Sequence, residues 1–184
     1  MSFKLKSKII LETGEELKGE KCIKDDQSVI GKIIFDTRVV GYEKTLTCPE
    51  YKNKIVCLSY PLIGNYGINQ EDIESSNIYP AGLIVSEISP IYSNYRADYS
   101  FSSFISKTQI PVISQVDTQY ITKKVREVNN LWGAIVPSEF DTSKVISEIK
   151  AKKEKSLQEL PSEDILEEKL PNTSKKKEEI TVLN

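Results

Sequence analysis

The sequence predicts a mixed α/β domain followed by an extension. Short apolar runs typical of buried strands recur along the chain, and two later stretches carry apolar residues at helical spacing. Because strands and helices do not alternate strictly, the pattern favours an α/β sandwich with helices on one side. A length of 184 residues is sufficient for one hydrophobic core.

The first predicted element is a hairpin near the N-terminus. Residues 8–11 form a short apolar run, Gly14 marks a turn, and residues 16–19 supply the returning arm. Ile30, Ile33, Ile34 and Phe35 make one predicted strand apolar on both faces, and residues 55–60 show the same character, so both strands are expected to lie centrally.

The segment between these two strands, residues 41–51, is predicted as a connector broken by Gly41 and Pro49. A residue that precedes proline is pushed toward extended backbone, so Cys48 is expected to lie at a well-defined corner.

Residues 61–69 are predicted as a loop. Gly64 and Gly67 can adopt positive φ, and Asn65 tolerates it better than most residues. Two interpretations stay open: a tight turn at the exit of a strand, or a loop that presents backbone to a ligand or partner. We take Gly64, Asn65, Gly67 and Asn69 as the candidate partner contact.

The second half of the chain contains both predicted strands and predicted helices. Three further runs predict strands: residues 82–85, 110–113 and 134–136. The spacing of Phe101, Phe104 and Ile105 predicts a short helix, and Asp117 is a plausible N-cap of a second one. We expect the domain to span residues 1–140. Residues 141–184 would be an extension that begins with a helix capped by Asp141 or Thr142 and continues as a linker from residue 161.

Composition excludes several function classes. The chain has no histidine, so Ser-His-Asp and Cys-His catalytic machinery cannot be built from it. Its net charge of -2 and the lack of a long apolar run predict no nucleic acid or membrane partner and a cytoplasmic location. Cys22, Cys48 and Cys57 are isolated, which predicts free thiols rather than disulfides, and no metal site or cofactor is expected on this chain.

Several motifs occur in an order and spacing that resembles one known family, the glutamine-dependent carbamoyl phosphate synthetase small subunit. The matching motifs are F-D-T at 35–37, G-Y-E at 41–43, L-T-C-P-E-Y at 46–51, Y-P-L-I-G-N-Y-G-I-N at 60–69, S-N-Y-R at 93–96 and I-P-V-I-S-Q-V-D-T-Q at 110–119. The resemblance covers roughly residues 7–178 and concerns the N-terminal domain of that subunit.

This resemblance implies a three-layer β/β/α sandwich and a non-catalytic role. In the family, the small subunit hydrolyses glutamine and passes ammonia to a large subunit, which makes carbamoyl phosphate for arginine and pyrimidine synthesis. The glutamine-hydrolysing residues lie in a second domain that has no counterpart in these 184 residues. The implied partners are the large synthetase subunit and, through the extension, a separate glutaminase chain.

The departures from the family pattern lie at substrate-facing positions. The family's glutamine-contacting serine corresponds to Glu50, whose ionised carboxylate accepts hydrogen bonds only and repels the substrate carboxylate. Asp36 and Glu43 stand where the family has amide side chains, so both positions gain a charge. Gln119 stands where the family has the arginine of its D-T-R motif. By contrast, the loop from Gly64 to Gly67 keeps the family's residues.

Two hypotheses follow from this pattern. The chain is one component of an enzyme subunit that docks on the large synthetase subunit and supports glutamine amide transfer. Alternatively, it is a diverged interaction or regulatory module that has lost glutamine function. An independent enzyme is disfavoured because no nucleophile–base pair is visible.

Overall fold

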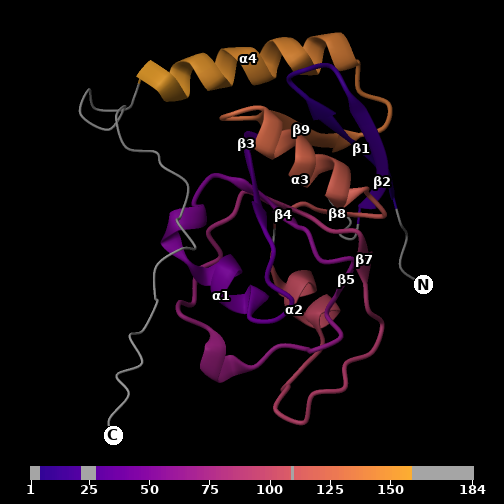
Figure 1. The fold of residues 1–184 in the computed structure, drawn as a ribbon, viewed down its shortest axis with the longest axis vertical. Coiled ribbons are helices and arrows are strands. Elements are labelled where there is room, and N and C mark those ends of the chain that lie inside the picture. The colour runs from indigo at the N-terminus through magenta and orange to yellow at the C-terminus, as the bar shows by residue number, and fades with distance from the viewer. Residues whose placement is uncertain (1–4, 22–27, 109, 159–184) are drawn as a thin grey trace, which may run out of the picture.

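The computed structural model describes residues 5–21, 28–108 and 110–158, as a mixed α/β fold (Figure 1). Its elements in chain order are β1 (Leu5–Leu11), β2 (Glu16–Lys21), β3 (Val29–Asp36), α1 (Tyr42–Thr47), the 3₁₀ helix η1 (Pro49–Tyr51), β4 (Ile55–Leu58), β5 (Leu62–Ile63), the 3₁₀ helix η2 (Gln70–Asp72), β6 (Gly82–Ile84), β7 (Glu87–Ile88), α2 (Phe101–Lys107), β8 (Val112–Ser114), α3 (Thr118–Glu127), β9 (Trp132–Pro137) and α4 (Thr142–Gln158).

Seven strands close into a barrel in the order β1-β2-β8-β6-β4-β3-β9, with β9 pairing back to β1. The pairs β3–β4, β4–β6 and β6–β8 are parallel, and the remaining pairs of the barrel are antiparallel. Strands β5 and β7 form a separate parallel pair beside it.

Alternating side chains divide the core into three clusters, because successive residues of a strand point to opposite faces. In β4, Ile55 and Cys57 point into the barrel, whereas Val56 and Leu58 pack outside it with α1 and α2. In β1, Ile9 and Leu11 point inward and Ile10 packs outward with residues of α4.

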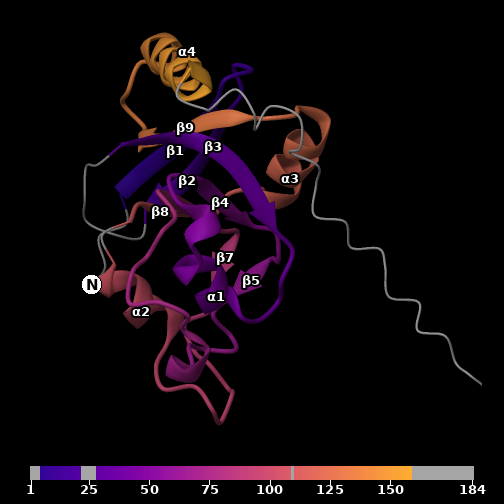
Figure 2. The ribbon, with the colours of Figure 1, turned by 90° about the vertical axis from the view of Figure 1, so that its left-hand side faces the viewer.

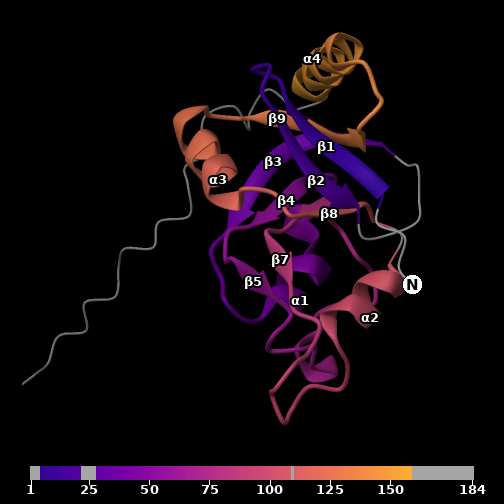
Figure 3. The ribbon, with the colours of Figure 1, turned by 90° about the vertical axis from the view of Figure 1, so that its right-hand side faces the viewer.

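Both outer apolar faces are covered by helices. Figures 2 and 3 show α4 on one side of the strands and α1 and α2 on the other, with α3 at the edge near β3. Val145 and Ile149 of α4 pack against Trp132, Ala134 and Val136 of β9.

The class of fold is confirmed, but the three-layer sandwich with helices on one side is corrected. Strand β9 pairs with both β1 and β3, and β8 pairs with both β2 and β6, so the sheet closes on itself. Two opposite outer faces are apolar, so each requires its own helices.

The local predictions are confirmed at the N-terminal hairpin, the central strands and the helix after Asp117, whose Oδ1 accepts from the Tyr120 N–H at 2.9 Å. The prediction of an irregular connector at 41–51 is wrong for residues 42–47, which form α1 after Gly41 turns the chain with φ 76°. The extended backbone predicted for Cys48 before Pro49 is confirmed, with φ -87° and ψ 127°. Asp141 caps α4 by accepting from the Lys144 N–H at 3.1 Å. The predicted linker at 161–184 lies outside the described residues.

Candidate functional site

The loop after β5 requires glycine at two positions. Gly64 has φ 95° and Gly67 has φ 82°, as the sequence predicts, and the Gly67 N–H donates to the Gly64 carbonyl at 3.1 Å. A Cβ on Gly67 would lie 2.5 Å from the Cβ of Ala97. The loop therefore depends on glycine both for its backbone conformation and for the close approach of a neighbouring segment.

That neighbouring segment is the chain between β7 and α2. The Ser93 N–H donates to the Asn65 carbonyl at 3.1 Å, and backbone bonds of 2.9 Å join Ile68 to Asp98 and Tyr99. As a result Gly64, Gly67 and Asn69 are buried and Asn65 is half-buried, so three of the four residues of the predicted partner contact lie beneath other residues.

The connection over this loop carries three exposed large hydrophobic residues, Ile91, Tyr92 and Tyr95, which we call the crest. Their exposed fractions are 74%, 40% and 94%. The β7–α2 connection that carries them forms the end of the molecule opposite α4 (Figures 1 and 3). The Tyr92 ring borders the space over Gly67, so the crest stands on the glycine loop. The apolar pair Ile91-Tyr92 in a loop of polar residues was the signal that sequence reasoning missed.

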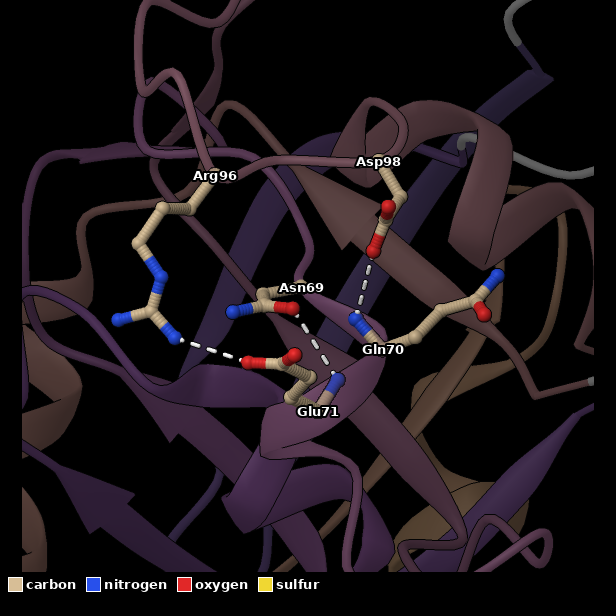
Figure 4. A pocket seen from close by; sticks show the side chains of 5 residues that line it. All are labelled: Asn69, Gln70, Glu71, Arg96 and Asp98. Atoms are coloured by element: carbon tan, nitrogen blue, oxygen red, sulfur yellow. Dashed lines mark hydrogen bonds and ion pairs between the residues drawn. The ribbon is translucent and has the colours of Figure 1, made fainter.

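A polar depression of about 360 Å³ lies beside the crest, lined by Asn69, Gln70, Glu71, Arg96 and Asp98 (Figure 4). Arg96 Nη2 donates to Glu71 Oε2 at 3.1 Å, Asp98 accepts from the Gln70 N–H at 2.9 Å, and Asn69 accepts from the Glu71 N–H at 3.1 Å. The Arg96–Glu71 and Asp98–Gln70 bonds link the crest's connection to η2, which gives the arginine of the S-N-Y-R motif a structural role.

Glu50 lies exposed in η1, and among the described residues its carboxylate has no hydrogen-bond or ion-pair partner. Its neighbour Tyr51 accepts a hydrogen bond from Arg38 Nη2 at 3.1 Å. Arg38 also donates from Nε to the Asp36 carboxylate at 2.9 Å, so the charge at Asp36 is balanced locally. An unpaired acid at Glu50 favours a cationic neighbour over a carboxylate.

Gln119 serves the scaffold. Its Nε2 donates to the Ser59 carbonyl at 2.7 Å, and the Ser59 and Thr122 hydroxyls are 2.7 Å apart. These bonds attach the first turn of α3 to the end of β4, immediately before Tyr60-Pro61.

Glu43 is the group whose environment the sequence did not reveal. Its side chain is fully buried in the first turn of α1, and neither carboxylate oxygen has a hydrogen-bond partner among the described residues. Burial raises the pKa of this carboxyl, and although the nearby backbone N–H groups of Glu43 and Asn69 lower it, the charge of Asp72 adds to the rise and the net direction is upward. Sequence reasoning marked Glu43 as a charged substitution but could not place it inside the core.

The described residues offer no cluster of Cys, Asp or Glu that could hold a metal ion. Cys48 and Cys57 are free thiols, and burial raises the pKa of Cys57 to about 12, so this thiol stays protonated; Cys22 lies outside the described residues. No helix in the described part of the chain is both long and apolar enough to cross a membrane.

Comparison with known proteins identifies related sequences. Residues 9–135 match the family described as "Carbamoyl-phosphate synthase small chain, CPSase domain". The pyrimidine-specific small chain of Halalkalibacterium halodurans is 40% identical over 147 residues, which cover 80% of this chain and 40% of that protein. The small chain of Buchnera aphidicola subsp. Schizaphis graminum is 39% identical over 152 residues, or 83% of this chain and 39% of that protein.

The chain therefore spans about 40% of the length of these relatives. Among solved structures, an aminopeptidase from Aneurinibacillus sp. strain AM-1 aligns over 73% of this chain and 32% of its own with 12% identity and a TM-score of 0.43. A likeness of that size supports no conclusion about fold or function. The extent and identity of the sequence matches show that this chain belongs to the carbamoyl phosphate synthase small-chain family.

Proposed function

We propose that the chain is the non-catalytic N-terminal domain of a glutamine-dependent carbamoyl phosphate synthase small subunit. It docks on the large synthetase subunit and supports glutamine amide transfer for carbamoyl phosphate synthesis, in the cytoplasm and in service of pyrimidine or arginine biosynthesis. The observation that carries this proposal is the family match over residues 9–135. A glutaminase on a separate chain, reached through residues 141–184, would complete the subunit.

The residues of the domain support a binding role. The chain has no histidine that could activate a nucleophile, and Cys57 is buried as a neutral thiol. The crest offers residues typical of a docking surface: two tyrosines and an isoleucine, each exposed on a single connection that is held by backbone hydrogen bonds. Tyrosine is among the residues that contribute most to protein–protein interfaces.

The crest makes the docking proposal testable by substitution. We expect Tyr95→Ala to weaken binding of the chain to the large subunit of the same organism by about tenfold or more, as measured by titration calorimetry. Phe140→Ala is the matched control, because Phe140 is an exposed aromatic residue, 45% accessible, that lies between β9 and α4 and away from the crest. Equal affinities of the Tyr95→Ala variant and the wild-type chain would reject the crest as the docking surface.

Glu50 favours a second candidate, a diverged interaction or regulatory module without glutamine function. Its exposed, unpaired carboxylate stands at the position of the family's glutamine-contacting serine. If this candidate is correct, Glu50→Ser should give glutamine affinity to the chain combined with a supplied glutaminase domain, while the wild-type combination has little. Tight glutamine binding by the wild-type combination would exclude this candidate.

A further inference from the structure

Glu43 is a buried ionisable side chain on a helix whose neighbouring residue, Tyr42, belongs to an apolar cluster. It follows Tyr42 in the first turn of α1, and its side chain is fully buried. Tyr42 packs in the cluster with Leu46, Ile68 and Phe101, and its ring meets Phe101 edge-on at 5.1 Å between centroids. Neither oxygen of the Glu43 carboxylate has a hydrogen-bond partner among the described residues. Buried charges are almost always paired, so this group needs a physical explanation.

The helix that carries Glu43 is fastened to the segment of residues 67–79 by three hydrogen bonds, which together we call the α1 clamp. The Tyr42 hydroxyl donates to the Gly67 carbonyl at 2.8 Å. The Glu74 N–H donates to Thr47 Oγ1 at 3.1 Å, and the Tyr79 N–H donates to the Leu46 carbonyl at 3.0 Å. Glu43 lies on the same short helix between these attachment points, and Asn69 and Asp72 of that segment lie close enough to its carboxyl to affect its pKa. Movement of the segment would therefore open a path for water to the buried carboxylate.

Four ionisable groups from the surrounding elements act on Glu43 or feel its charge. Asp72 of η2 repels the ionised carboxylate, whereas Lys44 of α1 attracts it. The nearby backbone N–H groups of Glu43 and Asn69 also lower the pKa of the carboxyl, but burial is the largest effect and the net direction is upward. Tyr42 of α1 and Tyr99 before α2 are affected by its charge. Lys44 is exposed to solvent, so its attraction is screened and does not offset burial. The neutral carboxyl is therefore the form that suits the closed structure.

We propose that the α1 clamp is controlled by one proton: it is closed while the Glu43 carboxyl is protonated, and it opens when the carboxyl ionises and becomes hydrated. The segment that is released carries η2 and the polar depression, and its Gly67 end supports the Tyr92 ring of the crest. The proposal does not depend on what the crest binds.

The test is amide hydrogen exchange of the full chain as a function of pH, with Glu74 and Tyr79 as reporters because their N–H groups belong to the clamp. Because the pKa of Glu43 is raised in the closed state, ionisation favours the open state, and the opening constant should increase with pH. After correction for intrinsic exchange, the opening constant should rise by up to about tenfold per pH unit above the usual carboxyl value of 4.5, and level off at the raised pKa. The Glu43→Gln variant keeps the shape of the side chain without its charge, so its opening constant should not change with pH.

The matched control is Glu74→Gln, which removes an exposed carboxylate from the same segment and should leave the pH dependence as in the wild-type chain. The Ile33 N–H, bonded to Leu131 at 2.8 Å within the barrel, should show no such dependence in any variant. An opening constant independent of pH in the wild-type chain, or a slope that survives in Glu43→Gln, would overturn the proposal. If Glu43→Gln does not fold, the ¹³C shift of the Glu43 carboxyl in the wild-type chain decides: titration at the ordinary value of 4.5 would also overturn it.

Discussion

Arg38 Nη2 lies 2.8 Å from Asp36 Oδ2, so these two residues form an ion pair across a single intervening residue at the end of β3. The Thr45 hydroxyl of α1 also donates to this carboxylate, and Arg38 continues to the Tyr51 hydroxyl of η1. By resemblance, the family has an asparagine at position 36. The charge introduced at Asp36 is therefore accompanied by a cation that neutralises it and joins β3 to the element that carries Glu50.

This pair predicts strong coupling between the two positions. Arg38→Met leaves the Asp36 carboxylate 7% exposed and without its cation, so we expect a loss of about 1–3 kcal/mol in the free energy of unfolding. The loss in the free energy of unfolding is expected at the lower end of this range, because the Arg38 side chain is 43% exposed. Adding Asp36→Asn should recover most of the loss. Urea denaturation of both single variants and the double variant measures the coupling, and strictly additive losses would contradict it.

Gly67 is predicted to tolerate no side chain. In Gly67→Ala the new Cβ would lie 2.5 Å from the Cβ of Ala97, on a backbone with φ 82°. In Gly14→Ala the backbone φ is 102°, but no atom beyond the adjacent residues lies within 4 Å of the new Cβ. Both variants incur the left-handed backbone cost of about 1–2 kcal/mol, but only Gly67→Ala adds overpacking of about 1–3 kcal/mol. Thermal and urea unfolding should rank Gly67→Ala well below Gly14→Ala. Equal stabilities would mean that the covering segment is not held against the loop.

The ion pair between Glu15 and Lys124 predicts a dependence of stability on pH. Lys124 Nζ is 2.8 Å from Glu15 Oε1, and this hydrogen bond, followed by the one from Thr13, lowers the pKa of Glu15 from 4.5 to about 2. Because the folded-state pKa lies below the unfolded value, the pair stabilises the fold above pH 4.5, and that contribution is lost as the pH falls toward 2.

We therefore expect Lys124→Gln to lower stability slightly at neutral pH, since both groups are partly exposed, and to have little effect near pH 2. Lys123→Gln is the control, because the Lys123–Glu127 pair is longer, at 3.8 Å, and largely exposed. Denaturant unfolding at several pH values provides the comparison. An effect of Lys124→Gln that grows as the pH falls would have the wrong sign.

Helix α4 is predicted to stabilise the barrel. Ile149 is fully buried against β9, so Ile149→Ala should lower the free energy of unfolding by about 2–5 kcal/mol. Leu157→Ala, on the same helix and 51% exposed, should change it by less than about 0.5 kcal/mol. A small effect of Ile149→Ala would support a domain that ends at residue 140, as the sequence predicts.

Sequence patterns predicted the elements whose signals are local. The hairpin around Gly14, the consecutive apolar residues of β4 and the Asp117 cap each depend on a few neighbouring residues, and each is confirmed. Helix α1 was missed because it is only six residues long and lies between Gly41 and Pro49. Such a short helix is stabilised by burial of Tyr42 and Leu46 in the core, which no local pattern reveals.

Strand pairing and burial that depend on residues distant in sequence could not be predicted from local patterns either. Closure of the barrel depends on β9 pairing with two strands that are far from it in sequence. Positive φ at Gly64 and Gly67 was predicted from residue type, but their burial depends on the distant segment around Tyr92. Family resemblance identified the position of Glu50, whereas only the fold reveals that Glu43 is enclosed.

The most direct test of the proposed function is light scattering on a sizing column, with the purified chain mixed with the large carbamoyl phosphate synthetase subunit of its own organism. The account predicts a stoichiometric complex, lost in Tyr95→Ala and retained in Phe140→Ala. Absence of any complex at tens of micromolar would leave the family assignment intact and contradict the docking role.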